Sequence, residues 1–154
     1  MSRPAMKYVD LMETHEPDPL FIPPAIGWMN VGERGLGILA LRDIKNGEVI
    51  EYSPVVVMSM TDLYRPDGTE IPIGAYAFHW GEENEKGESV VCGIVKGGYL
   101  ALANHDKDGN STVEPIEKDG VIEWKAIRDI RKGEEITFDY GCALWFEDKG
   151  RNPA

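Results

Sequence analysis

Three short segments of the chain combine residue types that could bind a ligand or carry out chemistry. Residues 34–37 read RGLG, and two glycines around one apolar residue let the backbone approach a ligand closely. Residues 104–110 read NHDKDGN and follow an apolar run, so their polar side chains have hydrogen-bonding capacity where the chain leaves the core. Tyr140 ends a strand-like run before Gly141, a place from which an aromatic hydroxyl can point into a cleft.

Each segment alone also has a structural explanation. Residues 34–37 lack the third glycine and the strand–helix unit of a dinucleotide fingerprint, and a simple turn would explain them. Asp106, Asp108 and Asn110 alternate as calcium ligands do, but the segment does not combine the sixth-position glycine with the twelfth-position glutamate of a calcium loop. His105 could be a hydrogen-bonded structural histidine and Tyr140 a buried one-bond tyrosine.

An internal repeat frames these segments. Residues 40–50 read ALRDIKNGEVI and residues 126–136 read AIRDIRKGEEI, so 7 of 11 positions are identical. Each copy predicts two extended stretches around a tight turn, at Asn46-Gly47 and at Lys132-Gly133. The pattern indicates two similarly built β-turn units around a pseudo-twofold core, although common turn chemistry would also produce it.

The rest of the chain favours a mainly β fold. Strand-like runs occupy residues 55–58, 75–80, 89–95 and 121–127, and residues 99–103 could form a short helix or a strand. No segment shows a long helical period, and 17 glycines and 10 prolines favour short elements with tight turns. The 154 residues fit one domain, with an arm at 1–25, an ordered domain at 26–146 and a tail at 147–154.

Charge and composition narrow the partners. The formal charge of −11 disfavours direct nucleic acid binding and suits a Lys-rich partner, although net charge also serves solubility. The two cysteines form no CxxC pair, so no metal site is expected. No apolar run approaches a membrane span and the N-terminus has no apolar signal region. We therefore expect a soluble intracellular protein, cytoplasmic or in a host nucleus, and not a secreted or membrane one.

The order and spacing of these segments resemble the SET-domain protein-lysine methyltransferases over roughly residues 27–145. The resemblance is carried by residues 33–48 (ERGLGILALRDIKNGE), by residues 102–105 (LANH) with Asn110, and by residues 128–141 (RDIRKGEEITFDYG). In size and layout the chain looks most like the small viral and bacterial SET proteins. It departs from the family at Asp106, where a serine is usual, at Gly109, where a proline is usual, and in lacking a cysteine-rich segment after the domain.

The resemblance implies a β-clip-like SET fold of several small sheets, with one or two short helices and a knot-like C-terminal crossing. It implies an S-adenosyl-L-methionine-dependent transferase, a histone methyltransferase or a methyltransferase of another Lys-rich protein. The implied catalytic residue is Tyr140, the implied cofactor-binding residues are Arg34, Gly35, Leu36, Gly37, Asn104, His105 and Tyr140, and the implied substrate-channel residues are Tyr76, Phe78, Phe138 and Trp145.

Further expectations follow from the same resemblance. Phe138 occupies a position where the family carries Phe or Tyr, and Phe there implies di- or trimethylation. The resemblance to small viral SET proteins is compatible with a homodimer. Two alternative functions remain open at this point. The chain could be a catalytically inactive SET-fold module that binds basic peptides, or a purely structural β domain that binds neither cofactor nor peptide.

Overall fold

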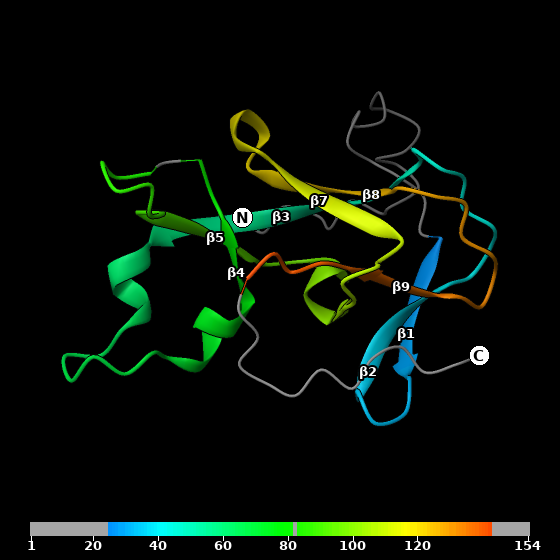
Figure 1. Cartoon of the computed structure of the whole chain (residues 1–154), viewed down its shortest axis with the longest axis horizontal. Coiled ribbons are helices and arrows are strands. Elements are labelled where there is room, and N and C mark those ends of the chain that lie inside the picture. Colours follow the sequence, from blue (N-terminus) through cyan, green and yellow to red (C-terminus); the bar gives the residue numbers. More distant parts are fainter. Residues whose placement is uncertain (1–24, 82, 143–154) are drawn as a thin grey trace, which may run out of the picture.

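The computed structural model describes residues 25–81 and 83–142. In this part the chain forms nine strands and four 3₁₀ helices, with no α-helix (Figure 1). The strands are β1 (Ile26–Asn30), β2 (Leu36–Ala40), β3 (Val49–Ser59), β4 (Ala77–His79), β5 (Val91–Val95), β6 (Asn104–His105), β7 (Ser111–Ile116), β8 (Val121–Ala126) and β9 (Glu135–Phe138). The 3₁₀ helices are η1 (Met60–Leu63), η2 (Pro72–Tyr76), η3 (Leu100–Leu102) and η4 (Glu117–Asp119).

The strands join edge to edge in the order β1-β2-β9-β7-β8-β3-β5-β4, and β6 pairs with β9. The β1–β2 hairpin therefore lies at one end and β4 and β5 at the other (Figure 1). Most pairs are antiparallel, but β9 runs parallel to both β6 and β7. This confirms the expected mainly β fold of small sheets. No helix among the described residues has the length and apolar character needed to cross a membrane.

The two copies of the repeat, which predicted similar turn units around a pseudo-twofold core, pair with each other. Ile44 and Ile130 exchange both backbone hydrogen bonds at 2.8 Å. Asp43 Oδ1 accepts the backbone N–H of Lys132 at 2.8 Å, and Asp129 Oδ1 accepts that of Asn46 at 2.9 Å. These equivalent contacts show that each turn caps the other around a pseudo-twofold relation.

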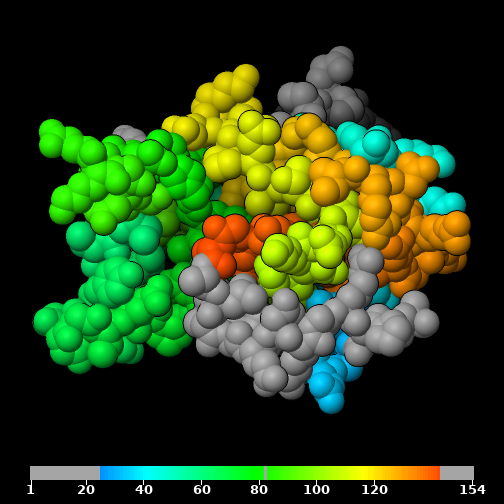
Figure 2. All heavy atoms as spheres, viewed as in Figure 1, coloured from blue at the N-terminus to red at the C-terminus, as the bar shows by residue number. Residues whose placement is uncertain are grey.

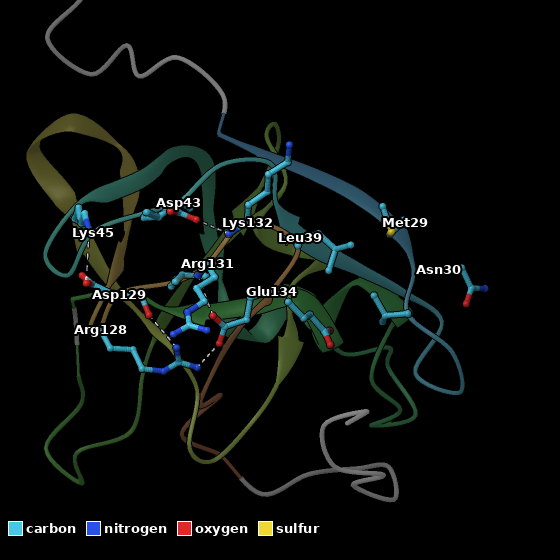
Figure 3. A pocket seen from close by; sticks show the side chains of 15 residues that line it. Met29, Asn30, Leu39, Asp43, Lys45, Arg128, Asp129, Arg131, Lys132 and Glu134 are labelled. Carbon is cyan, nitrogen blue, oxygen red and sulfur yellow. Dashed lines mark hydrogen bonds and ion pairs between the residues drawn. The ribbon is translucent and has the colours of Figure 1, made fainter. Parts of the chain in front are cut away.

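A groove of about 1240 Å³ adjoins the repeat turns, with Met29 and Leu39 on its apolar side (Figure 3). Its charged groups largely satisfy one another: Arg128 pairs with Glu134 at 2.6 Å, and Lys45 lies 3.8 Å from Asp129. Among the residues that the structure describes, none of the site residues predicted from the sequence lines this groove. The groove is thus a product of the repeat packing, and Glu135 at its edge also bonds Arg34 and Asn104.

The core lies between the sheets and is centred on Trp124, which is fully buried. Its indole N–H donates to the Ser111 hydroxyl at 2.8 Å, and that hydroxyl donates to the Thr137 carbonyl at 2.7 Å. A buried indole needs such a partner, because an unpaired N–H in the core costs free energy. This chain of bonds ties β8 to β7 and β7 to β9.

Two local predictions need correction, and one open alternative is resolved. Residues 75–80 do not form one strand, since Tyr76 belongs to η2 and only Ala77–His79 are extended. Pro72 starts η2, because its fixed φ suits the first position of a helical turn. Residues 99–103, whose sequence was compatible with a short helix or a strand, contain the helix η3. The described part holds four short helices instead of one or two.

Candidate active site

The β1–β2 turn brings the RGLG segment to the site. Val31 N–H donates to the Gly35 carbonyl at 2.8 Å, and Gly35 has φ of 76°, a left-handed conformation that favours glycine. The turn projects Arg34 inward, where its side chain is 9% exposed and pairs with the Glu135 carboxylate. Arg34 Nη1 also donates to the His105 carbonyl at 3.3 Å. The first and second sequence clusters therefore meet through one arginine.

Asn104 fastens the same two segments together. Its Nδ2 donates to the Leu36 carbonyl at 3.0 Å and to Glu135 Oε1 at 2.9 Å. Gly37 lies so close that a Cβ there would stand 2.8 Å from Glu135 Oε1 and 2.9 Å from Asn104 Nδ2. Only glycine fits at position 37 without moving these groups.

Glu135 joins this cluster, although no sequence motif assigned it a role. It lies in the second repeat copy, where the first copy has Val49. An acid replacing an apolar residue at an equivalent repeat position is the signal that could have identified it. The carboxylate serves both Arg34 and Asn104, so it is the common acceptor of the cluster.

Tyr140 links this cluster to an aromatic cavity. Its backbone N–H donates to His105 Nδ1 at 3.1 Å, so the proton of the neutral imidazole is on Nε2. Its hydroxyl donates to the Ala103 carbonyl at 2.7 Å. The ring stands 5.2 Å from the His105 ring and 5.0 Å from the Phe138 ring between centroids. Figure 2 shows the segments around residues 105 and 140 adjoining on one face, in yellow-green and orange-red.

The cavity beside Tyr140 has a volume of about 480 Å³. Phe78 and Phe138 stack in its wall, with ring centroids 6.2 Å apart. Residues of η2, β4, η3, β7, β8, β9 and the segment after β9 surround it, among them Tyr76, Phe78, Leu100, Ala103, Val113, Ile122, Phe138, Tyr140 and Cys142. A mainly apolar wall, in which Tyr76 and Tyr140 supply the two phenols, disfavours a charged amine inside.

The structure places the described cofactor and channel candidates in two adjoining groups. Arg34, Gly37, Asn104 and His105 form the polar cluster with Gly35 and Leu36 in its turn. Tyr76, Phe78, Phe138 and Tyr140 line the aromatic cavity. Trp145, the fourth expected channel residue, lies outside the described residues, as do most of the expected N-terminal arm and the whole C-terminal tail.

Burial raises the pKa of Tyr140 to about 12, with further contributions from Tyr76 and Cys142. A tyrosine in water titrates at about 10. We expect the absorbance difference between wild type and Tyr140→Phe to show no phenolate from Tyr140 below about pH 11. Folding then favours the protonated phenol, so this contribution to stability is complete below pH 10 and is lost as the pH rises through 12. A phenolate signal at pH 10 would contradict the prediction.

Comparison with known proteins agrees with this geometry. A model of the SET domain matches residues 35–141. A histone-lysine N-methyltransferase of Schizosaccharomyces pombe, named as specific for lysine 37 of histone H3, is 29% identical over 116 residues, which is 75% of this chain and 73% of that protein.

Solved structures share the fold. A Plasmodium falciparum protein described as a histone methyltransferase superposes with a TM-score of 0.57 at 26% identity, covering 81% of this chain and 100% of that one. KRYPTONITE, solved with DNA, a histone H3 peptide and SAH, superposes with a TM-score of 0.57 at 18% identity, covering 77% of this chain and 24% of that one. The chain belongs to the SET-domain family of protein-lysine methyltransferases.

Proposed function

We propose that this protein transfers a methyl group from S-adenosyl-L-methionine to the side-chain amine of a lysine in a basic protein. The observation that carries the proposal is the position of Tyr140. Its backbone bonds to His105 of the polar cluster, and its ring and hydroxyl border the aromatic cavity. A transferase needs its donor and acceptor sites to meet at one point, and Tyr140 is that point here.

The polar cluster fits the cofactor. Gly37 leaves no Cβ in the way, and Arg34 Nε is a buried donor with no acceptor among the described residues. We propose that residues 34–37, Asn104 and His105 hold the cofactor, which supplies an electrophilic methyl group on a sulfonium when bound. The KRYPTONITE structure, which contains SAH in a related fold, supports this assignment.

The aromatic cavity fits the lysine. The substrate lysine must have a neutral amine to attack the methyl group, yet the pKa of that amine in water is about 10.4. The wall of Phe78, Phe138 and Tyr140 lowers that pKa, because a poorly hydrated site disfavours the ammonium form. The Ala103 carbonyl, which already accepts the Tyr140 hydroxyl, has a second lone pair that can orient the amine. The aromatic faces then hold methylated ammonium products by cation–π contact.

Charge and relatives favour a histone-like substrate. The chain carries a formal charge of −11, which attracts a Lys-rich segment. The relative from Schizosaccharomyces pombe is named for histone H3. Phe138 contributes no hydroxyl to the cavity wall. A tyrosine hydroxyl at this position would take up room in the cavity and would hold the amine by a hydrogen bond. We therefore propose di- or trimethylation.

Labelled S-adenosyl-L-methionine, histones and other Lys-rich proteins provide the test. Transfer of label to a lysine, with di- and trimethyl products in the mass spectrum, would support the proposal. Only monomethyl product would overturn the proposed degree of methylation. Cofactor binding without transfer to any protein would contradict the proposed substrate class. If the protein shows no cofactor binding and no methyl transfer, an inactive SET-fold module would be favoured.

Gly37→Ala is expected to weaken cofactor binding at least about tenfold, since the new Cβ displaces the groups that shape the cluster. Calorimetric titration with S-adenosyl-L-methionine measures the change. Gly97→Ala is the matched control, because its Cβ would meet only Pro54 Cγ at an ordinary 3.8 Å. Equal affinities in the two variants would show that the cofactor does not use this cluster.

A further inference from the structure

Glu51 makes a set of contacts that the proposed reaction does not yet use. It lies on β3, and its two carboxylate oxygens accept the backbone N–H of Tyr99 at 2.9 and 3.0 Å. One of them also accepts the N–H of Leu100 at 3.1 Å and the hydroxyl of Ser53 at 2.6 Å. Hydrogen bonds to a carboxylate are stronger than those between neutral groups.

These contacts provide what η3 lacks. Tyr99 is the N-cap of η3 and makes no side-chain capping bond, so Glu51 satisfies its first backbone donors from another strand. The fit is close, because a Cβ at Gly98 would lie 2.6 Å from Glu51 Oε1. Gly98 also has φ of 86°, which favours glycine. The carboxylate therefore fixes both the start and the direction of η3.

The helix η3 leads directly to the acceptor of Tyr140. The Ala103 N–H donates to the Leu100 carbonyl at 3.1 Å, so Ala103 is held to the turn that Glu51 anchors. The Ala103 carbonyl then accepts the Tyr140 hydroxyl at 2.7 Å. Leu100, Ala101 and Ala103 all line the aromatic cavity. Two short steps thus connect Glu51 to the reacting end of Tyr140.

We propose that Glu51 is a positioning residue for methyl transfer: by anchoring η3 it places the Ala103 carbonyl, and through it the Tyr140 hydroxyl, in the aromatic cavity. This inference rests on the proposed function of Tyr140 and adds a residue that touches neither the polar cluster nor Tyr140 among the contacts described. Small displacements of a reacting group are costly, since a shift of about 1 Å can reduce a rate by ~100-fold.

The test is Glu51→Gln, which keeps the shape and one acceptor oxygen but puts an NH2 donor in place of the other. Since both oxygens accept the Tyr99 N–H, either orientation of the amide sets a donor against that N–H. We expect kcat to fall at least about tenfold. The affinity for S-adenosyl-L-methionine and a binding stoichiometry near one per chain should stay unchanged, because the polar cluster is not altered. Glu123→Gln is the matched control, since Glu123 lies on neighbouring β8 and bonds Tyr52 and Lys125 away from the site.

The titration of Tyr140 gives a second readout that does not need turnover. If Glu51→Gln releases η3, the Tyr140 hydroxyl loses its carbonyl acceptor and gains water, so its pKa should fall from about 12 toward its usual value. If the wild-type protein itself showed no turnover, the proposed function would be contradicted, but this titration would still test the role of Glu51. The inference is overturned if Glu51→Gln matches Glu123→Gln in Tyr140 titration, or if lower kcat only follows a lower folded fraction.

Discussion

Tyr140→Phe is expected to lower methyl transfer at least about 100-fold, the usual cost of removing one hydrogen-bonding group aimed at a reacting centre. The phenylalanine keeps the ring contacts with His105 and Phe138 but lacks the hydroxyl that bonds the Ala103 carbonyl. Without it, the phenol oxygen no longer helps to orient the reacting groups, and the Ala103 carbonyl alone is left to orient the amine. Single-turnover assays with saturating cofactor measure the loss in the chemical step directly.

The control for this variant is Tyr52→Phe. Tyr52 also has a hydroxyl in a hydrogen bond, to Glu123 Oε2 at 3.2 Å, but it lines neither the groove nor the cavity. Its turnover should stay within about twofold of wild type. Calorimetry on Tyr140→Phe should still show cofactor binding, because Arg34, Gly37 and Asn104 are unchanged. A fully active Tyr140→Phe would remove Tyr140 from the reaction.

Much of this site could be predicted from the sequence because it depends on residues with few substitutes. Gly37 is required by a close approach and Asn104 by an amide that donates twice. The repeat was also readable, since its paired aspartates cap each other's turns through side chains. Such contacts depend on residue type, and residue type is what a sequence shows.

Other parts of the site could not be predicted, for a physical reason. The acceptor for Tyr140 is a backbone carbonyl, that of Ala103, and every residue has one. Glu51 is an ordinary acid in an alternating strand until β3 is placed beside η3. Tyr76 looked like a strand residue because aromatic alternation favours strands, but Pro72 at the first position of the same segment favours η2 instead.

Gly109→Ala is expected to destabilise the fold by about 3 kcal/mol, because overpacking against a rigid neighbour has no easy relief. A Cβ at Gly109 would lie 2.7 Å from Phe138 Cα and 2.8 Å from the Thr137 carbonyl oxygen, and both are backbone atoms. Side chains can rotate away from a clash, but here β9 itself would have to move. The segment before β7 therefore packs backbone to backbone against β9 at this point.

The loss should extend to the bonds that follow Gly109. Asn110 is fully buried, donates to the Glu135 carbonyl at 2.7 Å and accepts the Thr137 N–H at 3.0 Å. If Gly109→Ala separates the two segments, these buried groups lose their partners, which adds a desolvation cost of about 1–3 kcal/mol for each.

Urea unfolding followed by circular dichroism measures the effect, with Gly97→Ala as the control that should stay within about 1 kcal/mol of wild type. Gly97 faces only an ordinary contact, at 3.8 Å, so the comparison isolates the clash from the general effect of replacing glycine. A Gly109→Ala protein as stable as wild type would show that β9 can shift at this contact. Phe138 and Tyr140 would then not owe their positions in the cavity to the packing of Gly109 on β9.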